Sequence, residues 1–157
     1  MMRELRRKDK QISMEEAQAL LEVSEYGVLS TVDSDGQSYG VPLNYVYTDG
    51  AIFFHCALPG HKVDNIENNP KVSFCVVGDT KVLPSDFSTN YASTIVFGTA
   101  SEVEGQERYD GLMKLLEKYS PDYLEEGKKY IEKLDNVTKV IKIDIKQMSG
   151  KKAPAKV

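Results

Sequence analysis

The stretch FHCALPGHK at residues 54–62 has the composition of a strand end, a turn at Pro59-Gly60 and the first turn of a helix. A helix N-terminus presents unpaired backbone N–H groups and about half a positive charge. Gly60 allows close approach of the backbone, and Lys62 adds a full positive charge. The stretch therefore predicts a strand-to-helix junction that binds a phosphate group.

Working outward, six segments have the apolar and β-branched composition expected of strands. They are residues 26–32, 39–47, 51–56, 71–78, 91–103 and 137–145. Turn sequences at 33–36 and 48–50 predict hairpins, and the short connections exclude parallel crossovers. The fold class predicted is mainly β, a six-stranded antiparallel barrel with flanking helices.

Four helices are expected around these strands. A Ser13-x-x-Glu16 capping box opens the first, which extends to about Ser24. The others cover residues 61–69, 107–119 and 121–134, and residues 79–90 are predicted to form a loop. We expect one domain over residues 13–148, a solvated basic arm over 1–12 and a disordered basic tail over 149–157.

The composition of the chain favours some classes of protein over others. The chain has 157 residues, which fits one domain, and its net charge of −4 does not favour nucleic acid as a partner. Two cysteines do not form a disulfide framework and suit a reducing compartment. No apolar run suggests a secretory leader or a membrane span, so a cytoplasmic protein without a membrane partner is expected.

His55 alternates with Phe53 on one face of its strand, whereas Phe54 and Cys56 take the other face. It is either a packed, hydrogen-bonded core residue or, with the backbone of Cys56 and Ala57, a contact for a phosphate or ribityl chain. A metal site of His55, Cys56 and His61 lacks a fourth ligand and a zinc-like spacing, so no metal is predicted.

The strand at 39–45 is irregular because it contains Gly40 and Pro42. Proline cannot donate to a sheet ladder, so Pro42 marks a sheet edge, a bulge or a gap that faces a ligand. Free backbone groups there would suit the edge of a flat heterocycle. The chain has no Gly-x-Gly-x-x-Gly, Walker or Gly-x-Ser-x-Gly motif, so any nucleotide-like ligand is held by a different architecture.

Four segments together resemble a known family. They are YGVLSTV (26–32), YGVPLNYVY (39–47), IFFHCALPGHKVDNI (52–66) and NPKVSFCVVG (69–78). The chain is similar over residues 5–148 to the FMN-binding split-barrel proteins related to pyridoxamine 5'-phosphate oxidase, and within them to the 5-nitroimidazole resistance branch.

The resemblance implies a Greek-key split barrel that forms a homodimer, with FMN bound in two clefts between the subunits. Carried over by position, three groups of residues contact FMN within one chain. These are His61 and Lys62 at the phosphate, His55, Cys56 and Ala57 beside the phosphate and ribityl chain, and Val41, Pro42, Leu43 and Asn44 along the isoalloxazine ring. Ser93 and Thr94 match the strand that reaches the flavin from the other subunit.

Two departures from the oxidases are visible. His61 stands where the oxidases have an arginine, and an imidazole carries less charge at neutral pH than a guanidinium. The oxidases' arginines near the C-terminus, which bind pyridoxal phosphate, have no counterpart here, so oxidation of pyridoxamine phosphate is not expected.

The function implied is an FMN-dependent oxidoreductase that reduces a small nitro-aromatic electron acceptor. His61 is the candidate catalytic proton donor, and phosphate binding alone is its other possible role. Tyr45 and Tyr91 are either walls of the cleft or core residues. The alternative function is a non-catalytic flavin-binding redox carrier or sensor, and a third possibility is haem in the same cleft.

Overall fold

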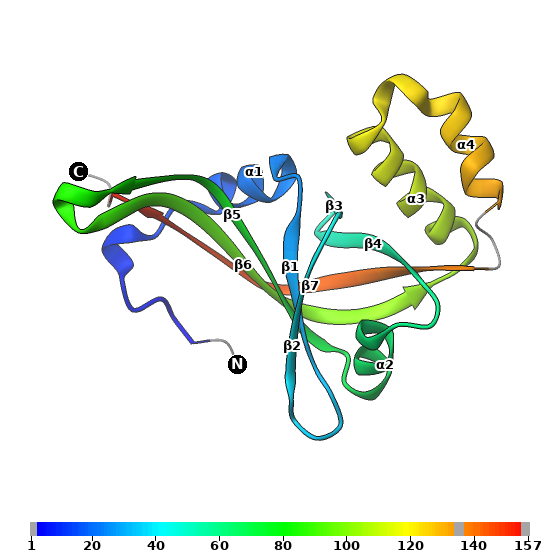
Figure 1. Ribbon diagram of the computed structural model, residues 1–157, viewed down its shortest axis with the longest axis horizontal. Coiled ribbons are helices and arrows are strands. Elements are labelled where there is room, and N and C mark those ends of the chain that lie inside the picture. Colours follow the sequence, from blue (N-terminus) through cyan, green and yellow to red (C-terminus); the bar gives the residue numbers. More distant parts are fainter. Residues whose placement is uncertain (1–2, 134–136, 155–157) are drawn as a thin grey trace.

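A computed structural model describes residues 3–133 and 137–154. Within these residues the chain forms a single seven-stranded antiparallel sheet that curls round a core, with helices outside it (Figure 1). The strands, in the sheet order β2-β1-β5-β6-β7-β4-β3, are β1 (Gly27–Val32), β2 (Ser38–Leu43), β3 (Val46–Thr48), β4 (Ala51–Ala57), β5 (Lys71–Leu83), β6 (Ser88–Val103) and β7 (Thr138–Ala153).

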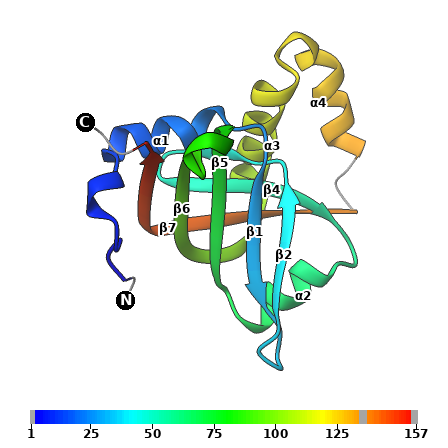
Figure 2. The ribbon, with the colours of Figure 1, turned by 60° about the vertical axis from the view of Figure 1, so that its left-hand side comes forward.

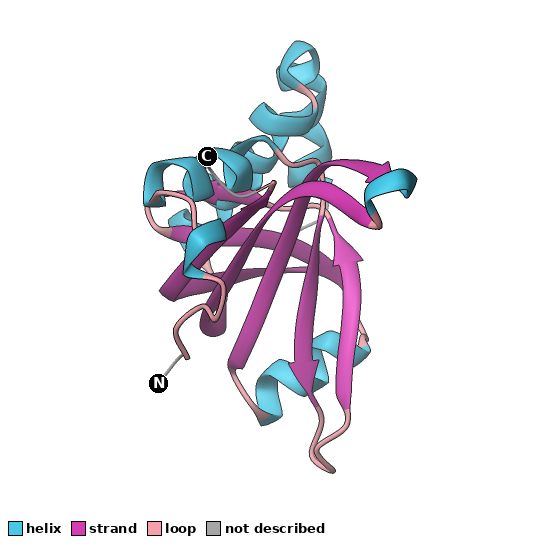
Figure 3. Cartoon of the chain, turned by 90° about the vertical axis from the view of Figure 1, so that its left-hand side faces the viewer, coloured by secondary structure: helices cyan, strands magenta, loops and turns pink. Residues whose placement is uncertain are grey.

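The α-helices are α1 (Met14–Val23), α2 (His61–Asn68), α3 (Gly105–Tyr119) and α4 (Leu124–Lys133). Short 3₁₀ turns lie at Lys8–Lys10, Pro84–Asp86 and Pro121–Tyr123. Figures 2 and 3 show α2 at one end of the barrel and the α3–α4 pair at the other. The predicted capping box is present, because Ser13 and Glu16 each bond the other's backbone N–H. The end of the predicted fourth helix, at Leu134, lies outside the described residues.

The prediction of a mainly β, antiparallel split barrel is confirmed, but the sheet has seven strands instead of six. The segment 39–47 breaks at Asn44-Tyr45 into β2 and β3, which form the two edges of the sheet. At the break, side chains of α3 form the hydrogen bonds to the backbone that a neighbouring strand would otherwise form. The Tyr119 hydroxyl lies 3.0 Å from both the nitrogen and the oxygen of the Tyr45 backbone, and the Lys118 ammonium donates to the same oxygen over 3.0 Å.

The prediction of a loop over 79–90 is wrong, because β5 and β6 continue as a long hairpin. The ladder shifts register between Gly78 and Lys81 and then runs on to Leu83 and Ser88. Residues in this extension are mostly polar on both faces, so the alternation that marks a half-buried strand is missing. The hairpin projects from the barrel with the C-terminal part of β7 beside it (Figure 1).

The predicted boundaries of the domain are too narrow at both ends. β7 continues to Ala153, paired with Tyr91 of β6, so residues 149–153 are not a disordered tail. The N-terminal arm also packs here, since Ile12 is buried and its N–H donates to the Gly150 carbonyl over 3.1 Å. Any side chain at Gly150 would press on Ile12 and Ala17, whose atoms lie 2.7–2.8 Å from an added Cβ. Residues 155–157 lie outside the described part of the chain.

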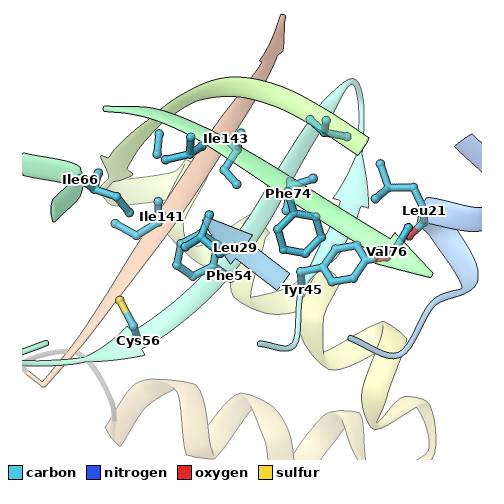
Figure 4. Packing of buried hydrophobic residues seen from close by; sticks show 14 of the residues in the cluster. Leu21, Leu29, Tyr45, Phe54, Cys56, Ile66, Phe74, Val76, Ile141 and Ile143 are labelled. Atoms are coloured by element: carbon cyan, nitrogen blue, oxygen red, sulfur yellow. The ribbon is translucent and has the colours of Figure 1, made fainter. Parts of the chain in front are cut away.

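The core has two parts, separated by β4. Ile52, Phe54 and Cys56 point into the barrel, where they pack with Tyr45 and Phe74 among others (Figure 4). On the other face, Ala51 and Phe53 pack against Leu112 and Leu115 of α3 and Ile131 of α4. The alternation predicted for β4 is therefore confirmed for its buried residues. No helix within the described residues has the length and apolar content needed to cross a membrane.

Tyr45 is the core residue with the most demanding polar contacts. Its ring is fully buried and stacks edge-on against Phe74, and its hydroxyl donates to the Leu21 carbonyl. Burial raises the pKa of Tyr45, so the folded protein keeps this proton at a pH where an unfolded tyrosine loses it.

Tyr45→Phe is expected to lower the free energy of unfolding by about 1–3 kcal/mol, because the buried Leu21 carbonyl loses its donor. The wild-type protein should lose stability as the pH rises above about 10, where only the unfolded chain releases this proton. The loss should be smaller in Tyr45→Phe. Urea unfolding at pH 7, 9 and 10.5 measures both effects, and an unchanged stability at pH 7 would contradict the assigned hydrogen bond.

Candidate functional site

The N-terminus of α2 has the arrangement that the sequence predicted. Gly60 is the N-cap and provides no side-chain cap. The N–H groups of Val63 and Asp64 donate to the Gly60 carbonyl over 3.0 and 3.2 Å. The N–H groups of His61 and Lys62 have no acceptor among the described residues. Two backbone donors at the positive end of the helix dipole are thus available to an anion.

Lys62 brings a positive charge to this helix end. Its side chain is half-buried and makes no ion pair within residues 3–133 and 137–154. This charge also shifts the pKa values of two residues at the end of β4. Burial lowers the pKa of His55 and the Lys62 charge lowers it further, so His55 is neutral at pH 7. Burial raises the pKa of the Cys56 thiol, and Lys62 partly opposes that effect.

The three residues predicted at the end of β4 lie on opposite faces of the strand. His55 and Ala57 are exposed, and His55 has no hydrogen-bond partner in the described part of the chain, so the interpretation of His55 as a hydrogen-bonded core residue is wrong. The Cys56 side chain lies in the barrel core (Figure 4), so only its backbone can face an outer ligand.

Tyr39 connects β2 to the helix end. Its ring lies against His61, with a centroid separation of 4.2 Å and an interplanar angle of 31°. The helix is also tied to β1, because the buried Asn65 amide donates to the Thr31 hydroxyl over 3.0 Å. Tyr39 was not among the site residues predicted from the sequence. Its aromatic character is the only local signal, and its contact is with a residue 22 positions further along the chain.

The four residues predicted to lie along the isoalloxazine ring also alternate between two faces. β2 pairs only with β1, which confirms the prediction that Pro42 can mark a sheet edge. Val41 and Leu43 pack toward the barrel core, whereas Pro42 and Asn44 are exposed. Val41 and Leu43 can therefore meet a ligand on the outer surface only through their backbone.

Ser93 and Thr94 do not join the other predicted residues within one chain. Both are buried in β6, where Ser93 pairs with Val77 and Lys151, away from α2. The Thr94 hydroxyl donates to the Ala17 carbonyl over 2.9 Å, which gives it a structural role beneath α1. Tyr45 is fully buried, so its interpretation as a cleft wall is wrong, and Tyr91 is half-buried with the Lys151 ammonium 5.6 Å from its ring centre.

Metal binding finds no support at these positions. In the described ranges, no group of three or more His, Cys, Asp or Glu side chains is arranged to hold a metal ion. Cys56 and Cys75 are both free thiols.

The curled antiparallel sheet, whose two edges β2 and β3 are consecutive in the chain, defines a split-barrel protein. The chain belongs to the pyridoxamine 5'-phosphate oxidase family, because a sequence profile of that family matches residues 13–152. Among curated proteins no relative matches significantly.

Solved structures share this fold. A conserved hypothetical protein from Mycobacterium tuberculosis has 23% identity and a TM-score of 0.79, covering 94% of this chain and 90% of that one. A candidate 5-nitroimidazole antibiotic resistance protein from Bacteroides thetaiotaomicron has 20% identity and a TM-score of 0.74, covering 90% and 85%. A FAD-binding protein from Mesorhizobium loti has 25% identity and a TM-score of 0.64, covering 92% and 97%.

Proposed function

We propose that this protein binds FMN, with the phosphate at the N-terminus of α2. One observation carries the proposal: two unpartnered N–H groups and an unpaired ammonium meet at one helix end, next to two exposed imidazoles. A phosphate dianion suits this donor set, because it accepts several hydrogen bonds and compensates the positive charge. A Cβ at Gly60 would meet only the Ala57 carbonyl, at 3.5 Å, so protein atoms do not crowd the side-chain position at Gly60.

The remaining residues would hold the rest of the molecule. His55 and the backbone of Cys56 and Ala57 would lie beside the phosphate and the ribityl chain. The exposed edge of β2 would lie along the isoalloxazine ring, with Pro42 and, just after the strand, Asn44 exposed and with the backbone of Val41 and Leu43 beside them.

The FAD-binding protein from Mesorhizobium loti shares the fold, so the choice of FMN over FAD is itself part of the proposal. A bound flavin supplies the ability to take up a pair of electrons and pass it to an acceptor. We infer that the acceptor is a small nitro-aromatic molecule, and the candidate nitroimidazole resistance protein among the structural relatives supports this class.

His61 has two possible roles in such a reaction. Its imidazole is exposed and oriented by stacking on Tyr39, so it can donate a hydrogen bond either to the phosphate or to a substrate. Orientation by an aromatic neighbour is useful for both roles, because it limits the rotamers that the imidazole samples.

A homodimer completes the proposed site. The outer face of β1, β5 and β6 exposes Val28, Val77 and Phe97, with Cys75 and Ile95 half-exposed between them. Apolar side chains gathered on one sheet face mark a protein interface. A second copy on this face would bring its Ser93 toward the flavin. Thr94 is less suited, because its hydroxyl is already used by the Ala17 carbonyl.

Lys62→Met is expected to weaken FMN binding about 10- to 100-fold, because one charge-assisted contact to the phosphate is lost. Fluorescence titration with FMN measures this change. Riboflavin, which lacks the phosphate, should bind the variant and the wild-type protein equally. Lys128→Met, on α4 and paired with Glu125, is the control for loss of one surface charge. Equal FMN affinity in Lys62→Met and Lys128→Met would exclude the α2 site.

Reduced, FMN-loaded protein is expected to regain its yellow absorbance faster with 1,2-dimethyl-5-nitroimidazole than with buffer under anaerobic conditions. Free FMN at the same concentration is the control. Reoxidation no faster than in buffer, or as fast in air alone, favours the carrier or sensor. His61→Gln separates the two roles of His61: proton donation predicts a slower reaction with FMN affinity retained, whereas phosphate binding predicts weaker FMN affinity.

Phe97→Asp is expected to convert the dimer to monomer at micromolar concentration, because a carboxylate within the apolar face would be desolvated. Sedimentation velocity measures the change, and FMN affinity should fall with it. Tyr130→Asp, a more exposed aromatic position on α4, is the control. A wild-type protein that sediments as a monomer would remove the need for a second copy in the site.

A further inference from the structure

A cavity lies at the break between β2 and β3, where the C-terminal end of α3 meets the segment that joins α1 to β1. Its volume is about 560 Å³. It is separate from the α2 site, since none of its lining residues belongs to α2 or β4. The residues that matter for its chemistry are Glu22, Glu25, Tyr26, Asn44, Lys118 and Tyr119.

Lys118 is the one cationic side chain among the described residues that line this cavity. Its ammonium donates to the Ser24 carbonyl over 2.7 Å and to the Tyr45 carbonyl over 3.0 Å, and it lies 3.9 Å from the centre of the Tyr45 ring. No carboxylate within the described residues pairs with it. An ammonium carries three N–H groups, so one remains for a ligand.

The groups around Lys118 hold it in place by hydrogen bonds and ring contacts, without a direct ion pair among the described residues. The Tyr119 hydroxyl is occupied by the Tyr45 backbone and by the Glu25 carbonyl, 2.6 Å away. Burial lowers the pKa of Lys118 to about 8, which leaves it mostly charged at pH 7 but able to release its proton in mildly alkaline solution. A lysine in this state can donate a strong hydrogen bond to an oxygen atom of a ligand.

The lining selects against a highly charged ligand. The carboxylates of Glu22 and Glu25 accompany the single ammonium, so a phosphate or a dicarboxylate would meet net repulsion. Tyr26 is exposed and offers an aromatic ring to a flat molecule. The combination suits a neutral planar compound with one electron-rich oxygen-bearing group.

The position of the cavity connects it to the proposed flavin site. Tyr39, near the start of β2, contacts His61, and Asn44 follows the last residue of β2 and lines the cavity. At about 3.3 Å per residue, the strand carries the chain roughly 17 Å from one to the other. A mononucleotide laid along β2 with its phosphate at α2 would direct its ring toward this cavity.

We propose that the cavity between Asn44 and Lys118 is the electron-acceptor pocket, which takes a neutral nitro-aromatic or quinone-like molecule whose oxygen accepts a hydrogen bond from the Lys118 ammonium. This assignment rests on the proposed flavin function for its role, but the binding itself needs only residues of this chain.

The test uses 4-nitrobenzyl alcohol, with 4-methylbenzyl alcohol as the matched ligand that lacks the nitro oxygens. Binding is measured by saturation-transfer NMR titration of the flavin-free and the FMN-loaded protein. The nitro compound should bind wild-type protein about tenfold more tightly than the methyl compound, and Lys118→Met should abolish the difference. Lys114→Met, one turn earlier on α3 and paired with Glu117, is the matched variant that should retain it.

A pH series on the wild-type protein gives a second measurement if Lys118→Met does not fold. The groups that face Lys118 are Glu22, Glu25, Tyr26, Tyr45 and Tyr119. Burial raises the pKa of both Tyr45 and Tyr119, so these two stay protonated. Affinity for the nitro compound should therefore fall about tenfold between pH 7 and pH 9.5, while affinity for the methyl compound should not change.

Equal affinity for the two ligands, or no pH dependence of the nitro compound, would overturn the proposal. The two proposals fail separately. If the nitro compound binds with the expected pH dependence but FMN does not bind, the pocket stands and the flavin function falls. If FMN binds and the two alcohols are not distinguished, the flavin function stands and the pocket is wrong.

Discussion

The architecture depends on which groups form hydrogen bonds with the backbone N–H and C=O of Tyr45. At this residue the chain leaves one edge of the sheet and begins the other, so neither edge offers it a ladder partner. A buried backbone N–H or C=O without a partner costs about as much as a lost hydrogen bond. Lys118 and Tyr119 supply the missing partners from α3, some 70 residues away, and the Tyr45 ring then fills the barrel beneath them. The contacts of Tyr45 thereby fix the break between β2 and β3, the position of α3 and part of the core.

The same arrangement accounts for where polar groups collect on the surface. Because β2 and β3 are both edges, the outer side of β2 is covered by no other strand, and its exposed backbone lies between two polar clusters. One cluster is the N-terminus of α2 with Lys62 and the two histidines. The other is the cavity around Lys118. A barrel closed completely by hydrogen bonds would leave neither an open strand edge nor a break for side chains of α3 to enter.

Much of the site was predictable because it is local in sequence. A strand, a proline-glycine turn and a helix with lysine in its first turn must place backbone donors and a cation together, whatever surrounds them. The positions of Tyr39, Lys118 and Thr94 were not predictable in this way. Tyr39 lies 22 residues from His61, and Lys118 lies 73 residues from Tyr45. The polar extension of the β5–β6 hairpin was missed for a related reason, since its pairing partners set its conformation and its own hydrophobic pattern does not.

Local sequence patterns were enough to predict the antiparallel barrel, the capping box at Ser13, the turn at Asp49-Gly50 and the backbone donors at the N-terminus of α2, because each depends on residues a few positions apart. The tertiary structure alone decided which side chains face outward at that end, where β7 stops, and that the segment 39–47 is two strands. Those outcomes depend on contacts between distant parts of the chain, chiefly the need to give buried backbone groups a partner, and no local pattern encodes which residue will provide it.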